Sequence, residues 1–351
     1  MYVKDGVKYF VVDGHTHFWD ASPANWVPGQ EQYAKGWIEC FHAYQSLGPA
    51  ETHWPLEKFQ KYSEEQMMTD LFDEGHVDVA IFQPTNLRQW YTEGFNTTEA
   101  NGALAERHPG KFVVNTNWDP RDGEDGLKAL EERAKRWGCV GAKLYTAEWK
   151  GDSRGWSLKS PEAARYLEKC QELGIRNIHI HKGPTIWPLD KDAFDVSDVD
   201  YAATNFPELN FIVEHVGLPR IEDFCFMATQ EPNVYAGIAV VVGGLMHARP
   251  RFFAKVMGEL LFWVGEDKML FGSDYAIWEP KWQVEGLVDW DYPAGDEFSD
   301  YPRWTTAAKK KVLGLNAARL YGVEVPAELQ LSDDEGTPAA REDAQLVEGA
   351  T

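Results

Sequence analysis

The chain has 351 residues, of which 44% are hydrophobic, and a formal net charge of −22 at pH 7. This length fits one large α/β barrel as well as two smaller domains. The negative charge argues against nucleic acid as a partner, since binding requires Lys and Arg to displace counterions from phosphate, and against adhesion to an anionic membrane surface.

Cysteine usage and hydropathy indicate a cytoplasmic protein. The four cysteines, at positions 40, 139, 170 and 225, are scattered and form no CxxC pair, so neither a disulfide framework nor a thiolate metal site is expected. The first residues lack the apolar core of a signal peptide. No uninterrupted apolar run approaches the ~20 residues of a membrane span.

Eight short runs rich in β-branched and aromatic residues alternate with segments of helical periodicity, a pattern typical of parallel βα units. The expected strands are 9–14, 77–82, 112–115, 140–144, 177–180, 209–213, 234–236 and 268–271. Capping residues and terminal glycines predict helices at 63–74, 122–137 and 160–173. This alternation favours a single-domain, distorted (β/α)8 barrel over residues 1–331. An open doubly wound sheet is the alternative, but no GxGxxG follows the first strand.

Two long segments interrupt the minimal barrel pattern. Residues 18–62 follow the first strand and residues 275–303 follow the last, and both are rich in tryptophan. Because βα loops leave the C-terminal ends of the strands, we expect these two to form the walls and lid of a pocket. Residues 332–351 are polar and acidic, which predicts a disordered tail.

Metal-type ligands stand at the ends of four expected strands. His15 and His17 end the first, His181 the fifth, His215 the sixth and Asp274 the eighth. Side chains at i and i+2 point to the same side of a strand, so the first two imidazoles can reach one ion. The strand ends of such a barrel converge on one face, and imidazole with carboxylate suits a first-row divalent cation. The sequence therefore predicts a metal site at that face.

Neighbouring polar residues receive supporting roles. His179 shares the parity of His181 but lies one layer deeper, which favours a histidine that supports a ligand or packs in the core. Glu214 has the opposite parity to His215, so we expect it to face the helix layer. By the same rule, Lys182 should point away from the barrel interior.

The string Val-Asp-Gly-His-Thr-His at residues 12–17 resembles the first-strand signature of the amidohydrolase superfamily. Within it, the chain is similar to the amidohydrolase-related group that includes the aminocarboxymuconate-semialdehyde and γ-resorcylate decarboxylases. The likeness continues through the later strand-end ligands to residues 311–322, which resemble the group's closing helix. It spans roughly residues 9–323.

The resemblance implies a zinc, manganese or iron ion, one or two per chain, held by His15, His17, His181 and Asp274. His215 would then be a general acid/base or a ligand to a second ion.

Three further residues bear on the number of metal ions. In dinuclear members of the superfamily a carboxylated lysine at the fourth strand bridges two metals, and Lys143 stands there. This lysine is otherwise a cationic group near the site. The long first loop departs from the family pattern and adds His42 and His53, which either contribute a ligand from the lid or are polar surface residues.

Candidate substrate-binding residues lie in the loops. Arg220 follows the sixth strand, where it could clamp a substrate carboxylate or make a surface salt bridge. Trp19 and Trp278 flank the expected pocket and could exclude water from it, or serve as ordinary core residues.

These features lead to a main hypothesis and two alternatives. The main hypothesis is a metal-dependent hydrolase or non-oxidative decarboxylase of a small organic acid, amide or lactone, with Asp274 and His215 handling protons. The first alternative is a non-haem dinuclear iron or manganese monooxygenase on the same scaffold. The second is a non-catalytic, metal-binding subunit of a related partner chain. The aromatic-rich loops favour a homo-oligomer.

Overall fold

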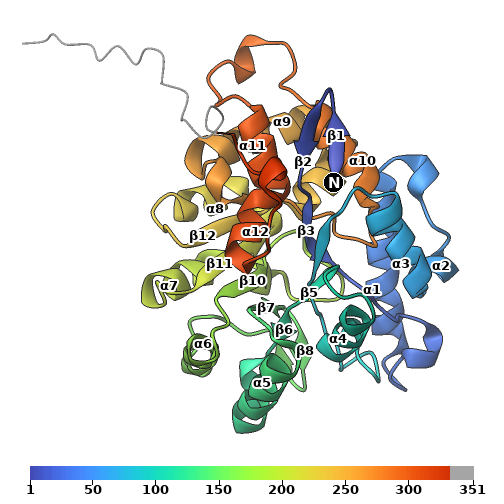
Figure 1. Cartoon of the computed structure of the whole chain (residues 1–351). Coiled ribbons are helices and arrows are strands. Elements are labelled where there is room, and N and C mark those ends of the chain that lie inside the picture. The colour runs from blue at the N-terminus through green and yellow to red at the C-terminus, as the bar shows by residue number, and fades with distance from the viewer. Residues whose placement is uncertain (333–351) are drawn as a thin grey trace, which may run out of the picture.

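The computed structural model describes residues 1–332 and shows a closed parallel barrel with helices outside it (Figure 1). The barrel strands are β3 (Val12–Thr16), β4 (Val79–Phe82), β5 (Phe112–Val114) with its continuation β6 (Thr116–Asn117), β7 (Gly141–Leu144), β10 (Asn177–His181), β11 (Asn210–Glu214), β12 (Val234–Gly237) and β13 (Met269–Leu270). Most strand residues are buried on both faces, as expected for a parallel sheet covered by helices.

Backbone hydrogen bonds link the strands into a closed barrel. The strands pair in parallel in the orders β3-β4-β5 and β6-β7-β10-β11-β12-β13, and Asn115 alone separates β5 from β6. The last strand then returns to the first: the Gly14 N–H donates to the Phe271 carbonyl (3.0 Å) and the Asp274 N–H to the His15 carbonyl (3.0 Å). The predicted barrel is confirmed.

Helices surround the strands and also occupy the long loops. They are α1 (Glu31–Tyr44), α2 (Leu56–Gln60), α3 (Glu64–Met68), α4 (Thr98–Arg107), α5 (Gly123–Trp137), α6 (Pro161–Leu173), α7 (Ser197–Asn205), α8 (Ile221–Ala228), α9 (Pro250–Trp263), α10 (Pro280–Asp289), α11 (Thr306–Lys310) and α12 (Asn316–Tyr321). None of the described helices combines the length and the hydropathy needed to cross a lipid bilayer.

The predicted helices are found with small differences at their ends. The Ser160 hydroxyl accepts a hydrogen bond from the Ala163 N–H at the start of α6, and Gly174 ends this helix in a left-handed conformation. The helix expected at 63–74 is α3 followed by a π-helical turn at Thr69–Asp73.

The start of the first strand was predicted too early. The structure begins β3 at Val12, because Val7–Tyr9 (β2) pairs instead with Tyr2–Lys4 (β1) in an antiparallel hairpin. Asp5 and Gly6 at its turn both have positive φ (50° and 81°), as a tight two-residue hairpin turn requires. A second small hairpin, β8 (Trp149–Lys150) with β9 (Ser153–Arg154), was not expected either.

The two long loops stand over the C-terminal ends of the strands. The first, residues 18–62, contains α1 and α2, and the second, residues 275–303, contains α10. The closing helix α12 packs against β3 and β13 and lies in front of the strands in Figure 1. The predicted acidic tail, 332–351, lies outside the described residues except for Ser332.

Candidate metal centre

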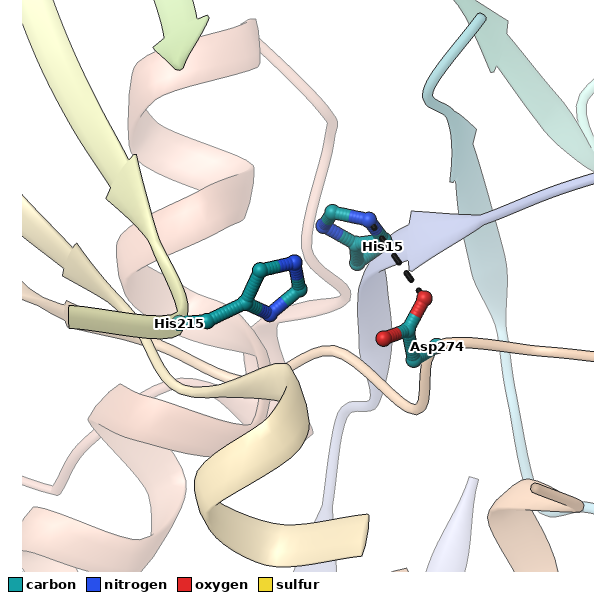
Figure 2. A group of neighbouring side chains, drawn as sticks. All are labelled: His15, His215 and Asp274. Atoms are coloured by element: carbon teal, nitrogen blue, oxygen red, sulfur yellow. Dashed lines mark ion pairs between the residues drawn. The ribbon is translucent and has the colours of Figure 1, made fainter. Parts of the chain in front are cut away.

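Three side chains from separate strands converge at the mouth of the barrel (Figure 2). His15 lies in β3, His215 directly follows β11, and Asp274 follows β13. One potential ligand atom of each lies within 4.8 Å of those of the other two, and all three side chains are buried. Asp274 Oδ1 is 3.6 Å from His15 Nε2.

The backbone turns sharply at two of these residues. His215 and Asp274 have φ values of 66° and 59°, in the left-handed region that side chains disfavour. The turn at His215 comes directly after β11, whereas the turn at Asp274 comes after residues 271–273, which follow β13. Each turn brings its side chain to the barrel mouth. Such conformations persist where the surrounding structure enforces them, often at functional sites.

His17 joins the cluster through its Nε2 atom. Its Nε2 is 3.2 Å from Asp274 Oδ1, and its Nδ1 is 2.8 Å from the backbone carbonyl of Gln83. With the hydrogen on Nδ1, where the Gln83 carbonyl can accept it, Nε2 keeps a free lone pair toward the cluster.

Glu214 corrects one prediction from the sequence. Its carboxylate does not face the helix layer: Oε2 lies 2.8 Å from His15 Nδ1 and Oε1 lies 2.5 Å from His179 Nδ1, inside the barrel. In the strand register Glu214 stands beside His181, so Glu214 and not His215 occupies the inward position. The turn at His215 separates that residue from the strand's alternation, which the parity rule could not anticipate.

His181 and Lys143 lie beside the cluster of His15, His215 and Asp274, and together these five residues form the polar floor of the cavity. His181 Nδ1 is 3.2 Å from His215 Nε2, and its Nε2 is 3.3 Å from the Tyr145 hydroxyl, whose ring stacks on the imidazole. Lys143 Nζ is 3.5 Å from His15 Nε2. The structure therefore brings His181 and Lys143 to the same cavity as the His15 cluster, although His181 lies outside the tightest group of three.

The electrostatics favour neutral imidazoles around an ionised carboxylate. Burial lowers the pKa of His15 to about 4 and that of His215 to about 3. Burial alone would raise the pKa of Asp274, but His15 and His17 beside it hold that pKa well below its usual range. Burial also lowers the pKa of Lys143, to about 8. Neutral histidines with an ionised aspartate are the protonation states in which these groups bind a metal.

The donor set fits a divalent first-row cation. Imidazole nitrogen and carboxylate oxygen suit zinc, manganese and iron. Among the described residues His215 Nδ1 is buried without a hydrogen-bond partner, and a buried polar atom of this kind ordinarily has a partner such as a water or an ion. Acceptor groups of the kind that fix the tautomer of a metal-binding histidine lie beside both rings: the Glu214 carboxylate near His15 Nδ1 and the Gln83 carbonyl near His17 Nδ1.

The long loops supply the walls of the cavity above this cluster. The space measures about 490 Å³ including its open mouth. Phe41 and Tyr44 come from the loop 18–62, and Ile277 and Trp278 from the loop after β13. The predicted origin of the walls, and the predicted place of Trp278, agree with the structure.

The two additional loop histidines lie away from the cluster. His42 Nε2 contacts the Trp54 carbonyl (2.8 Å) and His53 Nε2 the Gly48 carbonyl (3.2 Å). Neither lines the cavity. Both are thus held by the local backbone of their own loop, which gives no support to a ligand role.

Two expected substrate-binding residues also lie elsewhere. Arg220 is 60% exposed and pairs with Asp195 and, at 3.4 Å, with Asp223, because the turn after His215 carries the chain outward. Trp19 is buried: its indole N–H donates to the Phe59 carbonyl (2.7 Å) and its ring stacks on another aromatic side chain. Neither residue lines the cavity, so the placement expected for both differs from the structure.

Few sequence patterns point to the residues beneath the cluster. Gln83 Nε2 contacts the Gly14 carbonyl and His179 Nδ1, and Tyr321 from α12 reaches His179 Nε2 at 2.6 Å. This agrees with the deeper position predicted for His179. Gln83 directly follows β4, so its place at a strand end could have identified it. Lys182, as predicted, points away and pairs with Asp198 (2.8 Å).

Comparisons with known proteins agree with this architecture. A family model described as amidohydrolase matches residues 12–323. No curated protein sequence matches the chain at a significant level.

Among solved structures, the chain resembles an uncharacterised TIM-barrel protein from Bordetella bronchiseptica (18% identity, TM-score 0.63, covering 89% of this chain and 98% of that one). It also resembles 2,6-dihydroxybenzoate decarboxylase from Rhizobium (14%, 0.58, 90% and 99%). A third is 5-carboxyvanillate decarboxylase from Novosphingobium aromaticivorans, complexed with manganese (15%, 0.58, 90% and 96%). These likenesses concern the fold, and the family match covers most of the sequence: the chain belongs to the amidohydrolase family.

Proposed function

We propose that the chain is a metal-dependent enzyme that decarboxylates a small organic acid without an oxidant, or hydrolyses a small acid, amide or lactone. The observation that carries this proposal is the ionised Asp274 among the imidazoles of His15, His17 and His215, at the base of an apolar cavity. The resemblance to 2,6-dihydroxybenzoate and 5-carboxyvanillate decarboxylases supports decarboxylation as the first reaction to test.

The candidate ligands would be His15, His17, Asp274 and His181, with His215 and Lys143 beside them. A divalent ion held there supplies positive charge that polarises substrate oxygens and lowers the pKa of bound water. The aromatic and aliphatic walls would exclude bulk water, which strengthens the interaction of every charge in the cavity.

The chain's own residues would orient the substrate and move one proton. In a decarboxylation the bond between the carboxyl and its carbon breaks, carbon dioxide leaves, and the electron pair on that carbon takes up a proton. His215, whose Nδ1 lacks a partner, is placed to carry this proton. In a hydrolysis Asp274 would accept the proton of the attacking water. The Lys143 ammonium would attract an anionic substrate in either case.

Turnover by protein loaded with zinc, manganese or iron tests the proposal. Carbon dioxide release from hydroxybenzoates and hydrolysis of lactones should require the metal and continue without dioxygen. His15→Ala should abolish this turnover, and His42→Ala, a histidine outside the cavity, should not. Oxygen uptake with two ions per chain would instead indicate the monooxygenase. Tight metal binding without turnover of any of these substrates would favour the non-catalytic subunit.

A further inference from the structure

A second cavity opens beside the metal-site cavity at the same end of the barrel. It measures about 960 Å³ including its open mouth and lies over the ends of β4, β6 and β7. Thr85, Lys143 and Tyr145 line both cavities, so the two cavities adjoin at these three side chains. We call this second cavity the polar chamber.

The two cavities differ in chemistry. Above its polar floor, the metal-site cavity has walls such as Phe41, Ile277 and Trp278, whereas the polar chamber is lined by Asn86, Arg88 and other polar or charged side chains. A ligand that spans both would therefore place an apolar body over the metal centre and a polar or charged group in the chamber.

The charges of the polar chamber mostly cancel in pairs, with two cations left over. Asp119 pairs with Arg121, and Asp122 with Lys150. Among the described residues, neither Arg88 nor Lys143 makes an ion pair. An unpaired guanidinium at the wall of a cavity is suited to a carboxylate, which it can bind through two parallel hydrogen bonds.

Two more groups of the chamber favour an anion. Burial raises the pKa of Glu148 to about 8, so this carboxyl is neutral near pH 7 and can donate a hydrogen bond. The side-chain oxygen of Asn86 is buried and has no hydrogen-bond partner within residues 1–332. Since the amide oxygen and nitrogen exchange places when the side chain rotates, Asn86 can offer its amino group to a ligand oxygen.

We propose that the polar chamber binds a second anionic group of the substrate, chiefly through Arg88, so that the enzyme acts on a dicarboxylic or similarly dianionic acid. This inference rests on the proposed function, because it takes the metal centre as the place of the reacting group. It assigns substrate recognition to Arg88, which is exposed but lines the polar chamber without an ion-pair partner among the described residues, and leaves Arg220 paired with Asp195.

Binding measurements test the inference without requiring turnover. Calorimetric titration of the manganese-loaded protein compares diacids with matched monoacids. The ligands are isophthalate beside benzoate, and the aliphatic diacids from malonate to adipate beside matched monocarboxylates. Together they cover a range of separations between the two carboxylates of a diacid. At least one diacid should bind about 10-fold more tightly than its monoacid, in line with a charge-assisted hydrogen bond.

Arg88→Gln should remove most of this preference while the monoacid affinity stays within about 2-fold. Arg176 precedes β10 at the opposite end of the barrel, so Arg176→Gln is the matched control and should keep the preference for the diacid. Equal binding of monoacids and diacids by the wild type, or an unchanged preference in Arg88→Gln, would overturn the inference.

Failure of the proposed function would look different. In that case the diacid preference and its dependence on Arg88 would persist although no metal-dependent turnover is found. A crystal structure with the preferred diacid should also place one carboxylate within hydrogen-bond distance of Arg88, and a position elsewhere would contradict the proposal.

Discussion

Glu214 holds His15 from beneath: its Oε2 lies 2.8 Å from His15 Nδ1, and the opposite ring nitrogen of His15 faces Asp274. The same carboxylate contacts His179 through its other oxygen. A carboxylate behind a histidine fixes the tautomer and raises the basicity of the ring, which strengthens a metal bond on the far nitrogen. Glu214 is therefore a positioning residue for the candidate metal centre.

Replacing this carboxylate should weaken metal binding. Glu214→Gln keeps the shape but removes the charge, so we expect zinc or manganese affinity to fall about 10- to 100-fold. Competition with a chelating dye on the metal-free protein measures this directly. The exposed Glu208→Gln serves as control and should bind as the wild type does. Wild-type affinity in Glu214→Gln would remove Glu214 from this role.

The hydroxyl of Tyr321 in α12 should stabilise the folded barrel. The Tyr321 hydroxyl contacts His179 Nε2 (2.6 Å) and accepts from Asn115 Nδ2 (2.9 Å). Tyr321→Phe leaves these buried groups without a partner, at a cost of about 1–3 kcal/mol in the free energy of unfolding. Urea denaturation checks this, with the exposed Tyr201→Phe as a variant that should change little. A loss of unfolding free energy no larger than that of Tyr201→Phe would mean that His179 finds another hydrogen-bond partner.

Glu148 should make stability fall as the pH rises. Its pKa is raised to about 8 by burial, so the folded state keeps a proton that the unfolded state releases near pH 4.5. The contribution of Glu148 is fully present below about pH 4.5 and is lost as the pH rises to about 8. Each pKa unit corresponds to about 1.4 kcal/mol, so the loss is of the order of a few kcal/mol.

Glu148→Gln cannot ionise and should remove this dependence. The free energy of unfolding of the variant minus that of the wild type should be larger at pH 9 than at pH 5. Denaturation at both pH values measures this difference. An equal stability difference at the two pH values would show that Glu148 ionises normally in the folded protein.

The missing side chain of Gly36 leaves room for the ring of Trp187. A Cβ added at Gly36 in α1 would lie 1.8 Å from the Trp187 ring, and the loop of Trp187 also carries the cavity residues Pro184 and Ile186. Gly36→Ala should therefore destabilise the protein and displace this loop, although alanine favours a helix. In a Trp187→Ala background the same change should be neutral or stabilising by up to about 1 kcal/mol. Identical effects in both backgrounds would show that the two residues are not coupled.

The sequence predicted the barrel and its strand-end ligands because both follow from local patterns. Apolar runs with terminal histidines or aspartate placed His15, His17, His181 and Asp274 at the mouth, as the structure has them. Glu214 was misplaced because a left-handed turn at His215 follows from tertiary constraints and not from alternation along a strand.

Long-range contacts were the other source of error. The partners of His179 come from β11, from α12 and from Gln83 directly after β4, and no spacing in the sequence connects them. Arg220 had the right chemistry for a carboxylate, but an exposed position beside Asp195.

Metal binding by site variants tests the central claim most directly. Elemental analysis and chelator competition on the wild type, His15→Ala, Asp274→Asn and His42→Ala compare two residues of the cluster with one outside it. We predict at least one tightly bound divalent ion per wild-type chain, affinity lowered at least about 10-fold in His15→Ala and Asp274→Asn, and wild-type binding in His42→Ala. Unchanged binding in both cluster variants, or no bound ion in the wild type, would contradict the metal centre described above.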